Sequence, residues 1–396
     1  MPECRRGREW NVKSAPADLL VVGAGPTGCV LAEQAASALG WRVLVVEKRD
    51  HVGGNCHDPI HASGVRIHRY GPHYFRTNSP RVVAYLSRFT EWIPASYRVR
   101  TLVNGTLHPF PINLDTLEQF FGRQFTAPSA RAFLDARRVH CDSPRTSEEF
   151  LLARLGRELY EAFYLRYTIK QWGRHPRQLD PSVCGRVPIR FNREDRYVDH
   201  GFQQMPRDGF TALFERMLRH PRIEVRLNCD YDDIRNQVRP RYATVYGGPL
   251  DAFFDCRYGR LPWRSLRFEF KVRDANFVQP CVQINYPNDH RHTRSVEIKH
   301  VTGQRHARTV LACEFPAGDG EPYYPVPGPE SAALFGRYKS LAQRMERAER
   351  IFFVGRLGAY KYIDMDEAVL RALDTFNRRI RPLAVAGRGL LRARCR

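Results

Sequence analysis

Residues 19–28 have the sequence LLVVGAGPTG, and this stretch decides the fold. The apolar run at 19–22 predicts a fully buried parallel strand. It enters a turn with the spacing G-x-G-x-x-G, and a helical pattern follows over 29–39. A second apolar run at 43–46 ends in Glu47. A strand, a glycine turn, a helix and a second strand closed by an acidic residue together predict a Rossmann-type dinucleotide-binding unit.

Each position of the turn has a physical task in such a unit. Gly23 permits the tight turn, Gly25 lets the backbone approach a pyrophosphate, and Gly28 lets the helix pack on the strand. Thr27 lies in the turn just before the predicted helix, whose free N–H groups and positive dipole end favour phosphate. Glu47 is placed to accept hydrogen bonds from ribose hydroxyls. These five residues are candidate cofactor-binding residues.

The segment that begins at Glu47 favours FAD over NAD. It has the pattern E-K-R-x-x-x-G-G-N, which runs through Lys48 and Arg49 to Gly54 and Asn55. This pattern resembles the second diphosphate-contacting segment of FAD enzymes in the glutathione-reductase-like superfamily. A simple NAD dehydrogenase would have no reason for a glycine pair there, so FAD is the predicted cofactor. Lys48, Gly54 and Asn55 are therefore added to the candidate cofactor-binding residues.

The composition is ordinary for a globular enzyme apart from a large basic excess. The chain has 63 basic and 42 acidic residues, a formal net charge of +21. Such an excess is compatible with nucleic acid, an anionic membrane surface or an anionic small substrate as the partner. The basic residues form no single stripe, which disfavours a nucleic-acid-binding protein. No apolar run approaches the roughly 18 residues of a membrane span, so no membrane span is expected.

The N-terminal segment and the cysteines point to a cytoplasmic protein without a metal site. Residues 1–16 carry charges but no apolar core of the kind that marks a secretory signal. The ten cysteines include no C-x-x-C pair, so neither a zinc site nor a dithiol redox motif has its spacing.

Beyond residue 80 the chain alternates between helical and strand patterns. The pattern is mostly helical over 81–163, whereas 268–272 and 281–286 alternate like strands of an antiparallel sheet. A late apolar strand at 351–356 is followed by Asp364 and a further helical pattern. This second strand–glycine–acid–helix element predicts that the dinucleotide-binding domain is discontinuous.

Several segments in this order resemble bacterial UDP-galactopyranose mutases. They are YGPH at 70–73, YTIKQWG at 167–173, RVPIRF at 186–191, TRSVE at 293–297, EPYYPV at 321–326, GRL at 355–357 and YKYIDM at 360–365. Generic flavoproteins lack the four segments at 167–173, 186–191, 293–297 and 321–326, so the resemblance is specific to this family.

The resemblance implies an α/β fold, α+β overall, with a discontinuous Rossmann-type FAD-binding domain, an inserted helical domain and an antiparallel β-sheet substrate domain. The expected boundaries are a disordered tail at 1–16, the first FAD-binding part at 17–80, a mainly helical domain at 81–185 with a substrate flap at about 173–184, the sheet domain at 186–204 and 250–345, returning FAD-binding parts at 205–249 and 346–379, and a basic tail at 380–396.

The resemblance also implies roles for individual residues. Arg186 and Arg294 resemble the two arginines that neutralise the UDP diphosphate, a task suited to a planar, always-charged fork. His73 resembles the histidine near the flavin ring. The other implied contacts are Tyr324 and Tyr362 on the diphosphate, Phe163 and Tyr167 beside the uracil, Trp172 and Tyr197 beside the substrate, and Arg356, Asp364 and Met365 on the flavin.

The implied reaction converts UDP-galactopyranose into UDP-galactofuranose through a covalent adduct between the sugar and N5 of reduced FAD, without net redox change. An external reductant such as NAD(P)H and a homodimer are the implied partners. Tyr97 and Ala359 depart from residues that are common in the family, which affects fine substrate contacts. The alternatives are an amine-oxidase-like FAD oxidoreductase and a mutase for another nucleotide sugar, such as the N-acetyl relative.

Overall fold

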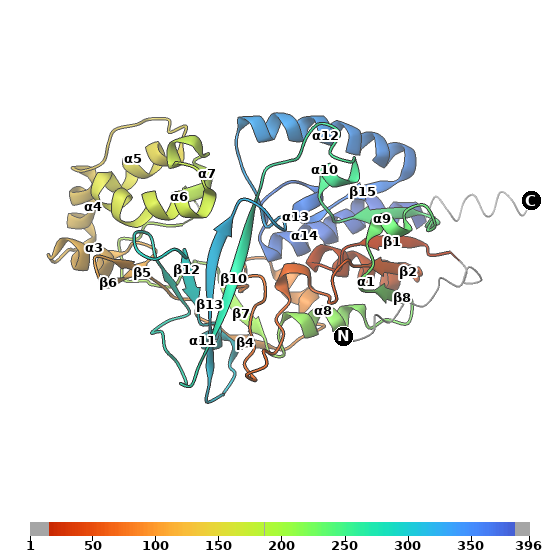
Figure 1. Cartoon of the computed structure of the whole chain (residues 1–396), viewed down its shortest axis with the longest axis horizontal. Helices are drawn as coiled ribbons and strands as arrows, with labels where there is room; N and C mark the ends of the chain where they lie inside the picture. The colour runs from red at the N-terminus through yellow and green to blue at the C-terminus, as the bar shows by residue number, and fades with distance from the viewer. Residues whose placement is uncertain (1–15, 186, 385–396) are drawn as a thin grey trace, which may run out of the picture.

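A parallel sheet of five strands forms one half of the molecule (Figure 1). The computed structural model describes residues 16–185 and 187–384. The strand order is β15-β9-β1-β2-β8, and each neighbouring pair is parallel. The strands are β1 (Leu19–Val22), β2 (Val43–Val46), β8 (Ile223–Arg226), β9 (Ala243–Tyr246) and β15 (Ile351–Phe353). The late strand β15 lies in the same sheet as β1, as expected for a discontinuous dinucleotide-binding domain.

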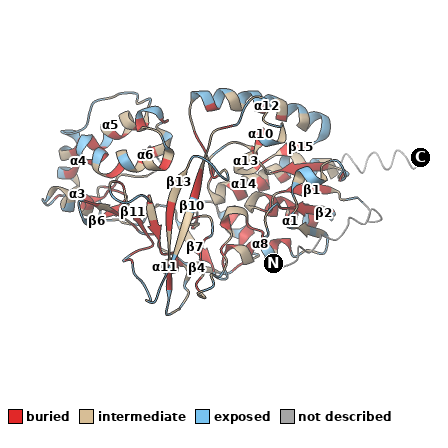
Figure 2. Cartoon of the chain, viewed as in Figure 1, coloured by how far each residue is buried: buried red, intermediate tan, exposed pale blue. Residues whose placement is uncertain are grey.

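Helices cover both faces of this sheet. Helix α1 (Pro26–Leu39) begins earlier than the pattern at 29–39 predicted, because proline is well tolerated in the first turn of a helix. It packs against α14 (Met365–Thr375) and α8 (Phe210–Leu218). All four residues of β1 and of β2 are buried, whereas the long helix α12 (Pro329–Glu349) keeps much of its outer face exposed (Figure 2). The predicted Rossmann-type unit is confirmed.

A second, mostly antiparallel sheet of seven strands lies beside the first sheet. Its order is β14-β10-β13-β12-β11-β5-β6, and the pairing of β11 with β5 is parallel. The strands are β5 (Val99–Val103), β6 (Thr106–Phe110), β10 (Trp263–Arg273), β11 (Gln283–Asn285), β12 (Arg294–Val296), β13 (Thr309–Ala317) and β14 (Tyr324–Pro325). The strands predicted at 268–272 and 281–286 are confirmed by β10 and β11.

Three short strands form a third sheet, in the order β3 (Phe75–Thr77), β7 (Phe202–Pro206) and β4 (Trp92–Pro94). Strands β4, β5 and β6 fall within 81–163, where the sequence pattern was mostly helical, so that prediction was wrong for this part. Strand β5 alternates strictly between buried and half-buried residues. Such alternation is the signature of a strand, but five residues are too few to outweigh the longer helical runs on both sides.

The other helices gather mainly at one side of the seven-stranded sheet (Figure 1). This group comprises α3 (Leu114–Phe121), α4 (Ala127–Asp135), α5 (Ser147–Leu159), α6 (Arg166–Trp172) and α7 (Ser182–Gly185). Elsewhere lie α2 (Pro80–Leu86), α9 (Tyr231–Ile234), α10 (Leu250–Phe253), α11 (Lys299–Thr302) and α13 (Gly355–Gly358). None of the helices in the described ranges combines the length and the apolar character that crossing a bilayer requires.

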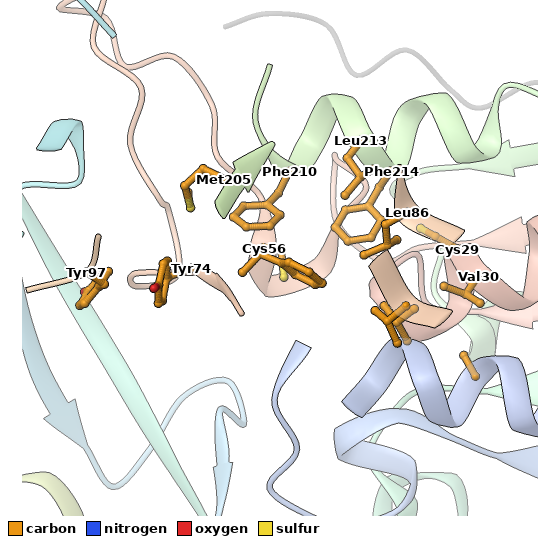
Figure 3. Close-up of a cluster of buried hydrophobic side chains, with 14 of the residues drawn as sticks. Cys29, Val30, Cys56, Tyr74, Leu86, Tyr97, Met205, Phe210, Leu213 and Phe214 are labelled. Atoms are coloured by element: carbon orange, nitrogen blue, oxygen red, sulfur yellow. The ribbon is translucent and has the colours of Figure 1, made fainter. Parts of the chain in front are cut away.

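A continuous apolar core joins the parallel sheet to the segment that follows β2. Figure 3 shows Phe210 and Phe214 of α8 beside Cys56 and Leu86, and Tyr74 beside Tyr97. Phe214 is also the nearest neighbour that a side chain at Gly53 would meet, at 3.3 Å. Helix α8 therefore packs against the glycine pair at 53–54.

The turn after β1 predicts a sharp effect of substitution at Gly28. A Cβ there would lie 1.9 Å from the carbonyl oxygen of Gly23, so Gly28→Ala must displace the helix from the strand. We expect Gly28→Ala to destabilise the protein by about 3 kcal/mol or more, measured by denaturant unfolding. Gly336→Ala is the matched control, because the site lies inside α12 with nothing within 4 Å of the new Cβ. It should stabilise by about 0.5–1 kcal/mol, and equal effects of the two changes would contradict the packing argument.

Candidate functional site

A cavity of about 380 Å³ opens at the carboxyl edge of the parallel sheet; we call it the dinucleotide cavity. Every residue that the sequence analysis assigned to the cofactor lines it: Gly23, Gly25, Thr27, Gly28, Glu47, Lys48, Gly54, Asn55, Arg356, Asp364 and Met365. Residues from the first 60 positions thus meet residues from beyond position 350.

The floor of this cavity consists of backbone brought close to backbone. Gly54 has a φ of 56°, and a Cβ there would lie 3.0 Å from the Cα of Gly25. Helix α1 begins at a glycine N-cap without a side-chain cap, and its first turn carries no acidic residue. Its N–H groups therefore remain available to an anionic ligand.

Glu47 connects the two glycine segments. Its carboxylate is buried and accepts hydrogen bonds from the backbone N–H of Ala24 at 2.8 Å and of Arg49 at 3.0 Å. Each oxygen still has a second lone pair for a ribose hydroxyl. Arg49 donates to Asn55 Oδ1 at 3.0 Å and to Glu321, and Lys48 lies 3.7 Å from the same Glu321 carboxylate. Arg49 and Glu321 thus fix the rim of the cavity, a role the sequence analysis did not assign.

A second cavity of about 480 Å³ adjoins the first; we call it the cleft. It is lined by all the residues assigned to catalysis or substrate that fall in the described ranges: His73, Phe163, Tyr167, Trp172, Tyr197, Arg294, Tyr324 and Tyr362. Arg186 lies outside the described residues. Its neighbours in sequence, Cys184 and Val187, line the cleft.

Arg294 forms a two-point ion pair inside the cleft. Its Nε and Nη2 donate to the two carboxylate oxygens of Glu314 at 2.8 and 2.7 Å. Glu314 is only 1% exposed, so the arginine holds it in place as a buried charge. Burial alone would lower the pKa of Arg294, but the Glu314 carboxylate raises it well above the ordinary value. The guanidinium therefore stays charged where it lines the cleft.

Tyrosine and tryptophan rings form the walls around Arg294. The rings of Tyr324 and Tyr362 stack at 5.5 Å, and Trp172 lies 6.4 Å from Tyr324. Burial raises the pKa of Tyr167 and of Tyr324 above the ordinary range of a phenol. Their hydroxyls are therefore neutral hydrogen-bond donors at any physiological pH.

His73 has a defined tautomer. Its Nδ1 lies 2.9 Å from the carbonyl oxygen of Gly71, which can only accept, so Nδ1 carries the hydrogen and Nε2 is an acceptor. The backbone N–H of His73 donates to His68 Nδ1 at 2.9 Å. Burial lowers the pKa of His73 to about 3, and the neighbouring His68 contributes a smaller shift in the same direction. His73 is thus a neutral ring and not a cation.

The cleft and the dinucleotide cavity share five lining residues, Asn55, His73, Arg356, Asp364 and Met365. Arg356 donates to the carbonyl oxygens of Ile363 at 2.7 Å and of Tyr323 at 3.3 Å, which ties the late segment to the tyrosine wall. Asp364 is the N-cap of α14, but its carboxylate pairs with Arg76 at 2.7 Å and does not cap the helix.

Partners of some predicted residues were missed by the sequence analysis. Glu314 and Arg76 pair with predicted residues, yet neither stands in a motif that points to its partner. Tyr97, the departure near the substrate, is buried and donates through its hydroxyl to Gln283 Oε1 at 2.8 Å. Arg76 follows His73 by three positions, and this proximity was the one available signal.

Comparisons with known proteins agree with this geometry. The family model described as UDP-galactopyranose mutase matches residues 162–362, and the model of an NAD(P)-binding Rossmann-like domain matches residues 21–89. The probable UDP-galactopyranose mutase of Klebsiella pneumoniae is 40% identical over 366 residues, covering 90% of this chain and 93% of that protein. The dTDP-fucopyranose mutase of Escherichia coli is 32% identical over 367 residues, covering 90% of this chain and 96% of that protein.

A solved structure extends the comparison to the fold. The crystal structure of a reduced UDP-galactopyranose mutase matches with a TM-score of 0.73 at 15% sequence identity, covering 92% of this chain and 94% of that one. At this sequence identity the match shows a shared fold only. Membership of the family is shown by the relatives found by sequence. The family predicted from the sequence motifs is confirmed: this chain belongs to the UDP-galactopyranose mutase family of flavin-dependent isomerases.

Proposed function

We propose that this protein interconverts UDP-galactopyranose and UDP-galactofuranose on a reduced FAD, without net redox change. The observation that carries the proposal is the junction of the two cavities at Asn55, His73, Arg356, Asp364 and Met365. A dinucleotide in one cavity and a nucleotide sugar in the other would bring their reactive ends together there. Family membership supports an isomerase over the amine-oxidase-like oxidoreductase that the sequence left open.

The residues of the dinucleotide cavity fit FAD. The glycine floor offers a diphosphate bare backbone, because Gly54 approaches Gly25 so closely that a Cβ on Gly54 would lie 3.0 Å from the Cα of Gly25. The uncapped start of α1 offers N–H groups to that diphosphate, and Glu47 keeps lone pairs for a ribose. The late segment with Arg356, Asp364 and Met365 would hold the flavin end. When bound and reduced, the flavin supplies a nucleophilic nitrogen to the anomeric carbon, so no side chain needs to act as the nucleophile.

The cleft residues would bind, orient and stabilise the charge of the substrate. Arg294, and Arg186 by its place in the motif, would neutralise the diphosphate as UDP separates from the sugar. The hydroxyls of Tyr324 and Tyr362 would donate to the same phosphate oxygens. Phe163 and Tyr167 would flank the uracil, with Trp172 and Tyr197 beside the substrate. His73 would accept a hydrogen bond at Nε2, because its Nδ1 hydrogen is held by Gly71.

Other parts of the functional hypothesis come from the family resemblance. We propose the domain boundaries given above, a flap at about 173–184 that closes over the nucleotide, a homodimer, and an external reductant such as NAD(P)H. A cytoplasmic location agrees with that source of electrons. A second candidate substrate is a dTDP-linked 6-deoxy sugar, because the relative from Escherichia coli is named for dTDP-fucopyranose.

One set of parallel incubations tests the proposal. Purified protein is reduced with dithionite and mixed separately with UDP-galactofuranose and with dTDP-fucofuranose, and the products are resolved by chromatography. We expect UDP-galactopyranose to form with reduced protein and not with oxidised protein, while the amount of reduced flavin stays constant. If only the dTDP-linked pyranose formed, the substrate would be the dTDP-linked sugar and not UDP-galactose. Failure to form either pyranose with flavin bound would refute the proposal.

Loss of Arg294 should be far more damaging than loss of a surface arginine. A preorganised donor to developing negative charge typically contributes about 3 kcal/mol, so Arg294→Ala should lower kcat about 10²-fold or more. Arg219→Ala is the control, because Arg219 is exposed and lines neither cavity. Turnover of Arg294→Ala within threefold of wild type would contradict the assigned role.

The neutral state of His73 makes a prediction about pH. Burial lowers the pKa of His73 to about 3, so the ring is protonated only below that pH and has no ionisation between pH 5 and 9. The plots of kcat/KM against pH for wild type and for His73→Gln should therefore have the same shape, even if the variant is slower. An inflection near pH 6–7 that is present in wild type and absent from the variant would show that His73 titrates during turnover.

A further inference from the structure

The ammonium group of Lys170 is enclosed by backbone carbonyl oxygens. Its Nζ donates to the carbonyl of Tyr286, and lies 3.2 Å from that of Asp289 and 3.3 Å from those of His290 and His292. Four acceptors around one ammonium exceed the three hydrogens it can donate, so the group is fully satisfied by backbone. No carboxylate is hydrogen-bonded to it among the described residues.

The four carbonyls all belong to the turn that joins β11 to β12, residues 286–292, which we call the hairpin turn. His290 adopts a φ of 61°, an uncommon conformation for a residue other than glycine. The ring of Tyr286 packs against His290 at 4.7 Å and against His292 at 4.5 Å. The turn is thus folded around the ammonium, and it leads directly into Arg294 at the start of β12.

Lys170 itself comes from a helix that contributes to the lining of the cleft. It lies on α6 between Tyr167 and Trp172, both of which line the cleft. Two further hydrogen bonds tie this helical region to the seven-stranded sheet and its hairpin turn. Asn288 of the hairpin turn donates to the carbonyl of Ala162 at 3.0 Å, and Arg264 of β10 donates to that of Gln171 at 3.1 Å. The Lys170 side chain therefore bonds α6 to the turn that precedes Arg294. We call the cleft residues Tyr167 and Trp172 of α6 the aromatic wall.

We propose that Lys170 is a positioning residue that fixes the distance between the aromatic wall on α6 and Arg294 on β12, and so sets the affinity of the cleft for a nucleotide diphosphate. The inference rests on the proposed function, because it takes the base and the diphosphate to be bound by these two walls. Lys170 touches neither the cofactor nor the substrate in this scheme. It acts through the hairpin turn.

The charge of Lys170 adds a testable dependence on pH. Burial lowers its pKa to about 8, opposed by the nearby Asp289. Other ionisable groups near it include Tyr286, His290 and His292 of the hairpin turn, and Arg264 of β10, which donates to the Lys170 carbonyl. Burial, followed by His290, lowers the pKa of His292 to about 4; Lys271 of β10 lowers it further and Glu269 opposes the shift. As pH rises through 8 the amine becomes neutral and loses one of its three hydrogens. Its bonds to the turn should then weaken.

The test compares Lys170→Met with Lys271→Met in the FAD-loaded protein. Methionine matches the length of lysine but cannot donate to the carbonyls. We expect Lys170→Met to raise the dissociation constant of UDP, measured by calorimetry, about tenfold or more. KM for UDP-galactose should rise in parallel, with kcat changed less than threefold and flavin content unchanged. Lys271 lies on β10 in the same sheet as Arg294, is exposed, and pairs loosely with Glu269 at 3.9 Å, so its variant should bind UDP like wild type.

The pH arm keeps the inference falsifiable even if the variant does not fold. Wild type should bind UDP less tightly at pH 9 than at pH 7, and Lys170→Arg, which stays charged, should lose most of that difference. Unchanged UDP affinity in folded Lys170→Met, or equal affinity of wild type at the two pH values, would overturn the inference. Wild type that binds no UDP at pH 7 would instead refute the proposed function, so the two failures are distinguishable.

Discussion

The close approach of two backbones at the glycine turn is the constraint on which the site depends. Gly28 leaves no room for a Cβ against Gly23, and Gly54 leaves little against Gly25. These approaches bring the start of α1 to the carboxyl edge of the sheet and bring the segment after β2 beneath it. Helix α14 then packs on α1, and its N-terminal residues Asp364 and Met365 reach the same edge. The junction of the two cavities is therefore a consequence of glycine packing.

The arginines around the cleft are each held by a carboxylate or by backbone carbonyls. Arg294 is held by Glu314, Arg76 by Asp364, and Arg356 by two backbone carbonyls. His73 is neutral and the cleft tyrosines Tyr167 and Tyr324 keep their protons, so these groups offer positioned hydrogen bonds and no strong side-chain base. Such a site suits a reaction in which the cofactor forms and breaks the bonds, while the protein fixes geometry and stabilises the leaving diphosphate.

Local patterns made much of this structure predictable. The strand at 19–22, the glycine spacing and Glu47 are close in sequence, and each has one physical explanation, so the dinucleotide-binding unit could be predicted without structural data. The substrate residues came from motifs that resemble a family, and those in the described ranges line one cleft. Arg186 falls outside those ranges, and its role stays a prediction.

Contacts between distant segments could not be predicted in the same way. Glu314 reaches Arg294 across neighbouring antiparallel strands, and this pairing depends on a register that the sequence does not display. Arg76 meets Asp364 across 288 residues of chain. Strand β4 pairs with β7, more than 100 residues later in the chain, and could not be predicted from its own sequence. Strands β5 and β6 instead form a hairpin with each other across Asn104 and Gly105, a local signal that the sequence analysis missed. Sequence patterns report local preference, whereas these features depend on the assembled fold.

The position of Tyr97 shows how assembly also limits the effect of a departure from the family pattern. A phenol in place of a smaller polar residue suggests a new hydrogen-bonding group beside the substrate. In the structure its hydroxyl donates to Gln283, whose amide donates to Asn285 at 2.7 Å, and Asn285 in turn donates to Thr101 at 3.4 Å. All four side chains are buried, and this chain of bonds crosses from β11 to β5 beneath the cleft. Because the phenol hydroxyl is committed to the floor, the departure alters the shape of the cleft more than its hydrogen-bonding capacity.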